Sequence, residues 1–467
     1  MSEQEQTLGR AALDETSSKE TAGKKVFVKT FGCQMNAYDS DKITALLGKD
    51  GYSATQEIGD ADLIVVNTCS VREKPEQKLR SFIGEMVPHR ARGAKVGIAG
   101  CMAQHAGADL FKQYRGQVDL VFGPDHVPNV REIVGKVEQG QRVLANSFLD
   151  NTQYAFVREV VTDGKAGAFV TIQKGCDNKC TFCIVPATRG VELSRPNAEI
   201  LEEVRAVVAK GVREITLIGQ NVNSYGLKVP GELTFAQLLY KVADVPGVER
   251  IRYTTSHPRD MGDDVIQAYR DLPQLTSHLH LPVQSGSDRM LRRMKRFYNR
   301  ERYMEVVRGL RDARPDISLS TDIIVGFPGE TDADFEDTMS LLEAVRFEGS
   351  FSFKYSPRPG TPALRLKDEP VPKKVMSERL TRYQKRQQEI QIESNHACEG
   401  KVLSVLVEGP SKWDPEVLCG RSSTFKMINF EGPKELVGTI VPVRVLRGFT
   451  NSLRGELAST PSGAELS

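Results

Sequence analysis

The sequence predicts an α/β protein made of a parallel, Rossmann-like α/β domain, a partial (β/α)6 barrel and a small all-β, OB-like barrel. Short apolar strands alternate with amphipathic helices from about residue 25 to residue 389, which is the pattern of parallel sheets. From about residue 401 the apolar period changes to two and glycine-rich turns separate the strands, which is typical of a small antiparallel barrel. The 467 residues leave room for about three domains.

Composition sets the expected ends of these parts. Residues 1–24 are rich in Glu, Gln, Ser and Thr and have no apolar core, so we expect a disordered tail and not an export signal. The parallel α/β domain is expected over residues 25–150, the partial barrel over 151–394 and the small barrel over 395–460. A second disordered tail is expected over residues 461–467.

Charge and hydropathy limit the class of protein. The net charge of +2 is too small to indicate nucleic-acid binding by itself, so any basic surface must be local. No apolar run has the length of a transmembrane helix, and we expect a cytoplasmic protein that does not bind membranes. In a reducing cytoplasm, its eight cysteines are expected to serve metal binding or catalysis and not disulfides. We expect a monomer.

Three cysteines of the first domain share one position relative to its predicted strands. The strands are expected over residues 25–30, 62–68, 95–100, 119–123 and 142–144, with helices over 40–50 and 74–86. Cys33, Cys69 and Cys101 each follow one of the first three strands at its carboxyl end. Ligands bind at that edge of open α/β sheets, and neighbouring strands lie about 4.8 Å apart. The three loops can therefore hold one iron–sulfur cluster, although a single cysteine is more often a small buried hydrophobe.

Two asparagines stand beside these cysteines. Asn36 and Asn67 are candidates to donate hydrogen bonds to cluster sulfurs. They are equally well explained as ordinary turn and strand-end residues.

A second group of cysteines forms one compact motif. The stretch "GCDNKCTFC" spaces Cys176, Cys180 and Cys183 as C-x3-C-x2-C directly after an apolar strand. One loop can wrap three thiolates around a single metal centre, and no fourth cysteine is near. A structural zinc site normally closes with four ligands, whereas an iron–sulfur cluster held by three cysteines keeps one iron open for a substrate or cofactor.

The motif opens the predicted partial barrel, whose active site is expected at the carboxyl ends of the strands. The strands are expected over residues 169–174, 214–219, 250–255, 278–283, 318–325 and 351–355, with helices such as 198–210 and 300–314 between them. Polar and glycine-rich segments follow four of these strands, at residues 219–222, 256–258, 284–287 and 326–330. His257 and His280 are possible ligands or acid/base groups, although a structural role is favoured for both.

Two further segments bear on nucleic-acid binding. Residues 289–302 concentrate seven basic residues beside Phe297 and Tyr298, a combination that can hold phosphates and stack bases, although most charged helices are solvated faces. A charged helix over residues 373–392 leads to strands expected over 402–407, 424–430 and 437–445. A small barrel of this kind suits nucleic acid or protein docking. Cys398 and Cys419 are expected to be ordinary cysteines.

Several motifs together resemble the radical S-adenosylmethionine (SAM) methylthiotransferases. "GCDNKCTFCIVPATRG" is similar to the radical SAM signature, and "KTFGCQMNAYDS", "NTCSVREKPEQK" and "AGCMAQ" are similar to the methylthiotransferase N-terminal domain. "IGQNVNSYG", "HLPVQSGSDRML", "TDIIVGFPGET" and "KYSPRPGTPA" match further. "GCQMN", "VREK" and "VLVEGPSKWDP" are most similar to the MiaB-type branch. The resemblance covers nearly all of residues 25–457 and implies a C-terminal TRAM barrel, although Cys419 is outside the family pattern.

The resemblance implies a tRNA-modifying transferase with two [4Fe-4S] clusters. Cys176, Cys180 and Cys183 would hold the cluster that chelates and cleaves SAM, and Cys33, Cys69 and Cys101 an auxiliary cluster that supplies sulfur. Two SAM molecules per turnover would serve as radical source and methyl donor. The expected product is 2-methylthio-N6-dimethylallyladenosine at position 37 of tRNA, beside the anticodon.

The resemblance also implies partners and leaves alternatives. The partners would be the tRNA anticodon stem-loop and a low-potential electron donor such as flavodoxin or ferredoxin. The nearest alternative substrates are threonylcarbamoyl-adenosine of tRNA and a ribosomal protein aspartate. An alternative of another class is a non-catalytic iron–sulfur RNA-binding redox sensor.

Overall fold

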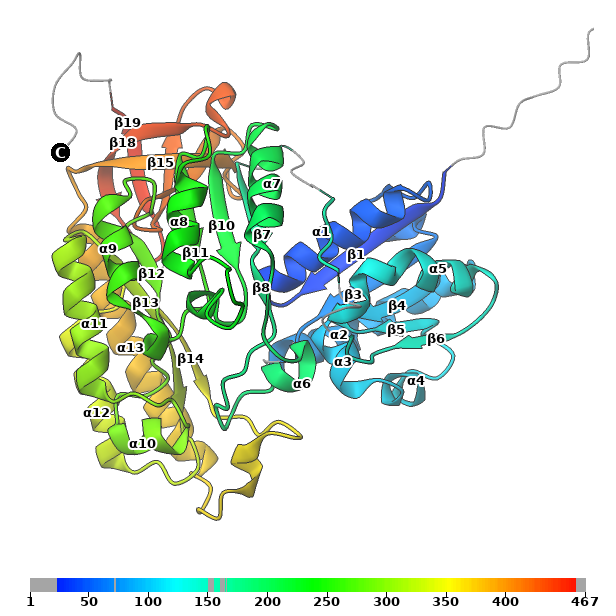
Figure 1. Ribbon diagram of the computed structural model, residues 1–467, viewed down its shortest axis with the longest axis horizontal. Helices are drawn as coiled ribbons and strands as arrows, with labels where there is room; N and C mark the ends of the chain where they lie inside the picture. The colour runs from blue at the N-terminus through cyan, green and yellow to red at the C-terminus, as the bar shows by residue number, and fades with distance from the viewer. Residues whose placement is uncertain (1–22, 71–72, 150–154, 160–163, 165, 459–467) are drawn as a thin grey trace, which may run out of the picture.

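The computed structural model describes residues 23–70, 73–149, 155–159, 164 and 166–458. Both predicted tails lie outside the described residues, apart from residues 23 and 24, and so does the expected domain boundary at 150–151. Figure 1 shows an N-terminal α/β domain beside a larger body, which is formed by the partial barrel and the C-terminal barrel. No described helix is both long and apolar enough to cross a membrane.

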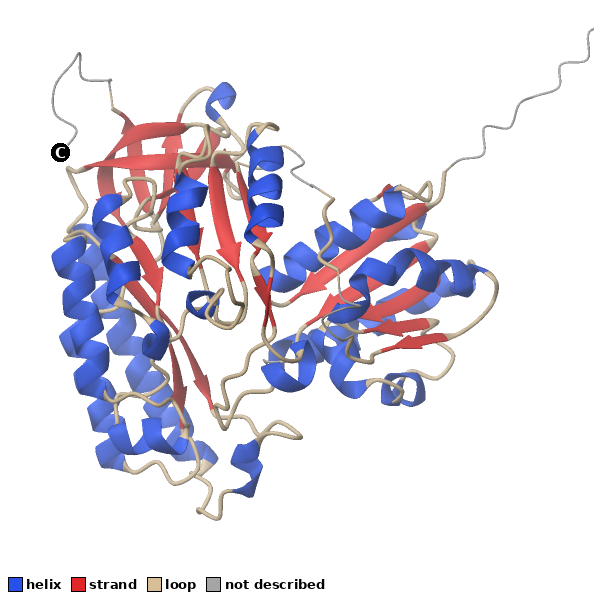
Figure 2. Cartoon of the chain, viewed as in Figure 1, coloured by secondary structure: helices blue, strands red, loops and turns tan. Residues whose placement is uncertain are grey.

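The N-terminal domain is the predicted parallel sheet covered on both faces by helices (Figure 2). All its strand pairs are parallel, in the order β2-β1-β3-β4-β5-β6. Its elements are β1 (Lys25–Phe31), α1 (Gln34–Gly48), β2 (Ser53–Ala54), β3 (Leu63–Thr68), α2 (Glu73–Ala91), β4 (Lys95–Ala99), α3 (Cys101–Ala106), α4 (Asp109–Gln113), β5 (Leu120–Phe122), α5 (Val130–Glu138) and β6 (Val143–Ala145).

Strand β3 shows why this sheet is buried on both sides. All six of its residues are buried. Ile64 and Val66 pack into a core on the face of α2, while Leu63 and Val65 pack into a second core with α1 and α5. Helices on both faces are what an all-parallel sheet requires.

Helix α1 begins at Gln34, earlier than the prediction of residue 40. Ser40, at which the sequence predicted the helix to begin, lies inside the helix, and its side chain does not cap the helix because it bonds to β1 and β3. It accepts hydrogen bonds from Thr30 Oγ1 at 2.7 Å and from Asn67 Nδ2 at 3.0 Å. Strand β2 was not predicted.

The partial barrel has its six main strands where the sequence predicted them. The sheets β7-β10-β11 and β12-β13-β14 are parallel and meet through a bridge between Ile251 and Leu275. Its elements are β7 (Gly167–Thr171), β8 (Gln173–Lys174), α6 (Val185–Arg189), β9 (Leu193–Ser194), α7 (Asn197–Val208), β10 (Glu214–Ile218), α8 (Phe235–Ala243), β11 (Arg250–Tyr253), α9 (Asp263–Asp271), β12 (His278–His280), α10 (Asp288–Arg293), α11 (Arg300–Ala313), β13 (Ser318–Val325), α12 (Asp332–Val345), β14 (Gly349–Lys354) and α13 (Lys373–His396).

The C-terminal barrel is closed and five-stranded, in the order β15-β16-β17-β19-β18. The strands are β15 (Val402–Pro410), β16 (Val417–Ser422), β17 (Met427–Glu431), β18 (Ile440–Gly448) and β19 (Leu453–Leu457). Strands β16 and β19 were not predicted. The expectation of a purely antiparallel barrel was wrong in one respect: β17 and β19 pair in parallel, and this pair completes the closure.

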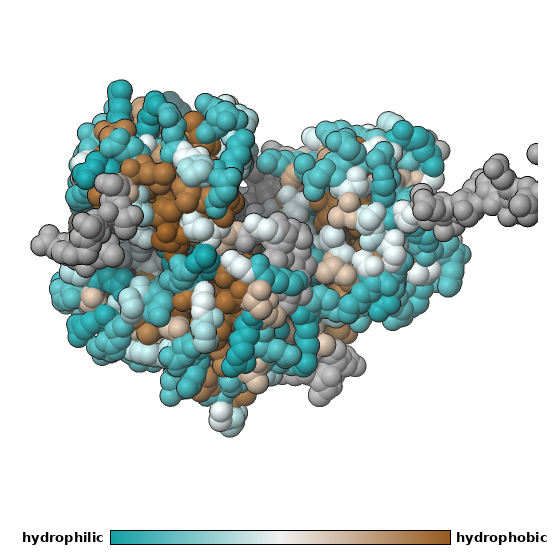
Figure 3. All heavy atoms as spheres, turned by 90° about the horizontal axis from the view of Figure 1, so that it is seen from above, coloured by the Kyte–Doolittle hydropathy of each residue, from teal (hydrophilic) through white to brown (hydrophobic). Residues whose placement is uncertain are grey.

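The C-terminal barrel sits on the amino-terminal ends of the partial-barrel strands (Figure 1). Arg250, the first residue of β11, donates to the carbonyl oxygens of Ser404 at 2.6 Å and Arg421 at 2.9 Å. Ser318, the first residue of β13, donates to the carbonyl oxygen of Thr424 at 2.8 Å. The opposite, carboxyl-terminal edge of the strands is therefore free of this barrel. Viewed from above, hydrophilic groups cover most of the surface, with apolar groups between them (Figure 3).

Candidate functional site

The first cysteine group gathers at one edge of the N-terminal sheet. β1, β3 and β4 are adjacent strands, and Cys33, Cys69 and Cys101 follow their carboxyl ends. Cys33 is the N-cap residue of α1, and Cys101 is the first residue of α3. The Cys69 thiol is hydrogen-bonded to both other thiols. The structure therefore brings these three predicted site residues into contact.

Glycine is required beside this group. Gly100 has φ +89°, a conformation that other residues rarely adopt. A Cβ there would lie 2.2 Å from Asn67 Oδ1 and 2.8 Å from the Thr68 carbonyl oxygen. The turn that leads into Cys101 consequently depends on a missing side chain.

A buried arginine from the partial barrel lies against the same cysteines. Arg189 ends α6 and is 5% exposed. Its guanidinium donates to Asp39 Oδ2 at 2.7 Å and to Asn36 Oδ1 at 3.4 Å. Hydrogen bonding to Cys69 and the charge of Arg189 lower the pKa values of Cys33 and Cys101, while hydrogen bonding raises that of Cys69. The site therefore favours anionic sulfur at two of its three cysteines, Cys33 and Cys101.

The two asparagines are held mainly by each other. Asn36 Nδ2 donates to Asn67 Oδ1 at 3.0 Å, and Asn67 Nδ2 donates to the Asn36 carbonyl oxygen at 2.8 Å. Asn36 does not donate to a cysteine as predicted but accepts a hydrogen bond from one, because Cys33 Sγ donates to Asn36 Oδ1 at 3.5 Å. Both amides therefore brace the strand ends that carry the cysteines.

The second cysteine group lies in the loop between β8 and α6, at the carboxyl edge of the partial barrel. Cys176 and Cys180 are buried and Cys183 is half-buried. The Val185 amide donates to Cys183 Sγ at 3.4 Å, and Arg296 Nη1 donates to Cys180 Sγ at 3.4 Å. Burial raises the pKa of Cys176 to about 11 and that of Cys183 to about 12.

The donor chemistry of both groups fits iron–sulfur clusters. Each group offers three thiols, and soft thiolates favour such clusters. Among the residues that the structure describes, no three His, Cys, Asp or Glu side chains surround a single metal ion. A cluster differs from one ion because each cysteine binds a different iron, whereas the sulfurs around a zinc ion all lie about 2.3 Å from one point.

Buried polar atoms without a hydrogen-bond partner in the described structure lie on the same edge of the partial barrel as the second group. They follow the carboxyl ends of β7, β10 and β11 in the chain and comprise Gln173 Oε1, Asn221 Oδ1, Ser256 Oγ and His257 Nε2. Burial lowers the pKa of His257 to about 2, so its ring is neutral. The segments of the last three are predicted from the sequence as site segments, whereas Gln173 lies within a strand and no motif marks it.

His280 has partners of its own. Its Nδ1 lies 3.0 Å from Ser320 Oγ, and its Nε2 lies 3.6 Å from Asp322 Oδ1. These contacts support the structural role that the sequence favoured. Cys398 and Cys419 contact backbone carbonyls at 3.4 and 3.6 Å, away from both cysteine groups.

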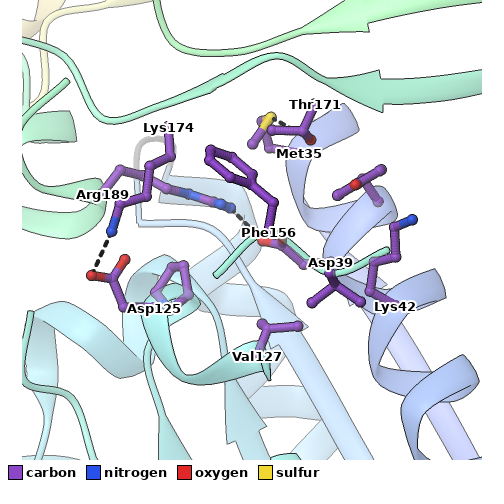
Figure 4. A pocket seen from close by; sticks show the side chains of 12 residues that line it. Met35, Asp39, Lys42, Asp125, Val127, Phe156, Thr171, Lys174 and Arg189 are labelled. Atoms are coloured by element: carbon purple, nitrogen blue, oxygen red, sulfur yellow. Dashed lines mark hydrogen bonds and ion pairs between the residues drawn. The ribbon is translucent and has the colours of Figure 1, made fainter. Parts of the chain in front are cut away.

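Buried ion pairs join the N-terminal domain to the partial barrel. Figure 4 shows Arg189 directed at Asp39 and Lys174 directed at Asp125, and all four residues line one small cavity. Lys174 Nζ and Asp125 Oδ2 are 2.7 Å apart, with side chains 7% and 2% exposed. Sequence analysis missed these residues, because nothing local in the chain marks partners so far apart.

A second part of this junction centres on Glu203 of α7. Its carboxylate accepts from Lys42 Nζ of α1 at 2.6 Å and also binds Arg195. All three side chains are at most 3% exposed. The junction thus holds the two cysteine groups in one arrangement, with α6 running from the second group to Arg189 at the first.

Comparison with known proteins places each part of the chain. Residues 170–342 match the radical SAM superfamily, residues 25–123 match the uncharacterized protein family UPF0004, and residues 396–458 match the TRAM domain. The fold is similar to that of the radical S-adenosylmethionine methyltransferase TsrM from Kitasatospora setae with tryptophan and a SAM analog bound. The TM-score is 0.52 at 14% identity, covering 82% of this chain and 78% of that one.

Curated relatives match over nearly the whole length. A tRNA-2-methylthio-N(6)-dimethylallyladenosine synthase of Geobacter metallireducens is 48% identical over 440 residues, covering 94% of this chain and 99% of the relative. The Myxococcus xanthus protein of the same name is 47% identical over 439 residues, covering 93% and 94%. The chain therefore belongs to the family of tRNA-2-methylthio-N(6)-dimethylallyladenosine synthases within the radical SAM superfamily.

Proposed function

We propose that this protein is a tRNA methylthiotransferase that converts N6-dimethylallyladenosine at position 37 into its 2-methylthio derivative. The observation that carries the proposal is the junction of two three-cysteine groups, joined by α6 and by buried ion pairs, in a chain of this family. Sulfur insertion and radical formation need two separate centres that stay in a fixed relation.

Family membership implies SAM and a [4Fe-4S] cluster. We propose that Cys176, Cys180 and Cys183 hold that cluster, and that Cys33, Cys69 and Cys101 hold a second one. When bound, these groups would supply the radical chemistry, the inserted sulfur and, from a second SAM, the methyl group.

The protein's own residues position and shield these groups. Burial of Cys176 and Cys180 excludes water from their sulfurs. Arg296 donates a hydrogen bond to Cys180 Sγ, and Arg189 places a cation at the first group, where it favours negatively charged sulfur at Cys33 and Cys101. The unpaired atoms of Gln173, Asn221 and Ser256 offer hydrogen-bond acceptors and a hydroxyl donor to a polar ligand such as the amino-acid part of SAM.

The substrate side of the proposal is RNA. A TRAM domain and tRNA-modifying relatives support tRNA as the partner. An anticodon-loop base is single-stranded, so it can be turned out into a pocket at modest cost. A monomer in the cytoplasm that draws electrons from flavodoxin or ferredoxin completes the proposal.

The test compares substrates directly. Protein reconstituted with iron and sulfide under anaerobic conditions is incubated with SAM, a reductant and one of three substrates: prenylated tRNA, threonylcarbamoylated tRNA or ribosomal protein. The products are identified by mass spectrometry. We expect methylthiolation of prenylated tRNA alone. Reaction with either other substrate instead would overturn the substrate assignment, and RNA binding without formation of 5′-deoxyadenosine would favour a redox sensor.

A further inference from the structure

A cationic hollow lies at the rim of the second cysteine group. It has a volume of about 660 Å³, and its lining includes Arg259, Arg292, Lys295, Phe297, Tyr298 and Arg302. This volume lies within the range of ordinary ligand pockets, about 300–1,000 Å³, and leaves room for a single nucleotide. We call this feature the 295 hollow.

The basic segment 289–302 divides into inward and outward residues. Arg289 pairs with Asp334, and Arg293 pairs with Asp368. Arg300 donates to the Asp337 carbonyl oxygen at 2.8 Å. Arg289, Arg293 and Arg300 therefore have a structural role within the protein.

The remaining cations face the hollow. Arg292 and Lys295 are exposed, and their side chains make no hydrogen bond or ion pair with any residue that the structure describes. Arg259 forms an ion pair with its neighbour Asp260, and Arg302 forms one with the exposed Glu305 and also donates to the Met261 carbonyl oxygen at 3.3 Å. No acidic residue is among the residues lining the hollow. The hollow is therefore complementary to an anion.

Backbone strain holds an aromatic ring in the hollow. Lys295 and Phe297 have φ angles of +54° and +57°. Such conformations cost non-glycine residues about 1–3 kcal/mol each and tend to be kept at functional sites. Their alternation turns Phe297 outward, where it is 62% exposed, and Arg296 inward, where it is 5% exposed.

The same loop contacts the predicted reaction site. Arg296 donates to Cys180 Sγ at 3.4 Å and to the Pro282 carbonyl oxygen at 2.7 Å. Arg296 is the residue between Lys295 and Phe297. A ligand of the 295 hollow would consequently be bound next to the centre that Cys180 serves.

We propose that the 295 hollow binds a nucleotide of single-stranded RNA that flanks the modified base. Arg292 and Lys295 hold its phosphates, and its base stacks on Phe297. Stacking on an aromatic side chain is worth about 1–3 kcal/mol per base, and a cation beside the ring adds to it. This inference rests on the proposed function, because it names the part of the RNA that the reaction site receives.

The test measures binding of a fluorescent anticodon stem-loop that carries the prenylated adenosine, by anisotropy over a range of salt concentrations. Phe297→Ala is expected to weaken binding about tenfold, and Phe297→Trp to retain it. The double variant Arg292→Gln/Lys295→Gln is expected to lower the slope of log affinity against log salt by about 1.4, for two phosphate contacts on a single strand.

Arg308→Gln is the matched control, because Arg308 is exposed on α11 and does not line the hollow. Circular dichroism and iron content check that each variant folds. Wild-type affinity in both Phe297→Ala and the double variant would overturn the inference, as would equal losses in Arg308→Gln. The proposed function fails separately, if the wild-type protein does not methylthiolate the RNA. If the same variants lost binding to an acidic peptide and kept RNA binding unchanged, the hollow would be a binding site for protein, and this result would also overturn the inference.

Discussion

Replacing Glu203 by Gln should loosen the junction between the N-terminal domain and the partial barrel. The change keeps the size of the side chain and removes its charge. Lys42 and Arg195, which are 3% and 1% exposed at their side chains, would then face each other without a buried anion. Breaking a buried ion pair by removing one partner costs about 3–5 kcal/mol. Since about 1.4 kcal/mol is a factor of ten, the open form should gain a factor of about a hundred to a few thousand.

The loss should depend on pH in a defined direction. Burial lowers the pKa of Lys42, and the Glu203 carboxylate opposes this shift. Without that carboxylate the pKa should fall further, so the folded variant gives up its proton more readily than the folded wild type, while the unfolded chains do not differ at Lys42. Stability of the variant therefore rises with pH more steeply than that of the wild type, and its deficit should shrink as the pH rises toward the ordinary lysine pKa of about 10.4. Arg195 stays charged throughout this range.

Hydrogen exchange of the backbone amides of α1 and α7 measures the opening, under anaerobic conditions and with the full chain. Glu202→Gln is the matched control, because Glu202 is exposed on the same helix and its side chain makes no hydrogen bond or ion pair with a residue that the structure describes. Faster exchange is expected in Glu203→Gln alone. Equal exchange in the two variants would refute the reasoning that this buried charge holds the domains together.

Three further variants test separate parts of the account. Cys33→Ala should lower the iron content from about eight to about four atoms per chain, because one four-iron cluster is lost. Formation of 5′-deoxyadenosine should be retained. An unchanged iron content would contradict the assignment of a second cluster to these cysteines. Gly100→Ala should cause the same loss, because its Cβ would lie 2.2 Å from Asn67 Oδ1; full iron content would show that the turn adapts. Arg250→Met leaves carbonyl oxygens of the C-terminal barrel without donors, at about 1–3 kcal/mol, and should speed proteolysis between the barrels, whereas a wild-type cleavage rate would contradict this docking role.

The sequence predicted the regular elements best where one face is buried. β13 was predicted to the residue, because buried and partly exposed positions alternate along its full length. β16 and β19 were missed, since each is short and interrupted by glycine at Gly420 and Gly455. Those glycines are required because a Cβ would lie 2.1 Å from the Leu406 carbonyl oxygen and 2.5 Å from Val443.

The candidate site could be predicted only in part. Both cysteine groups followed from spacing and from their position after strands, and the structure brings Cys33, Cys69 and Cys101 together as expected. Their role as cluster ligands stays a prediction. The part played by Arg189 was hidden, although it lies in a quoted motif, because its partner Asp39 is in another domain. Which residues of the basic segment point inward and which point outward could not be predicted either, because this depends on the positive φ angles of Lys295 and Phe297.

The central claim is methylthiolation of prenylated adenosine in tRNA. Its most direct test is mass spectrometry of nucleosides from the total tRNA of a strain that lacks this protein. We expect that 2-methylthio-N6-dimethylallyladenosine disappears, that N6-dimethylallyladenosine accumulates, and that the intact gene restores the methylthiolated nucleoside. An unchanged content of the methylthiolated nucleoside in the deletion strain would contradict the account.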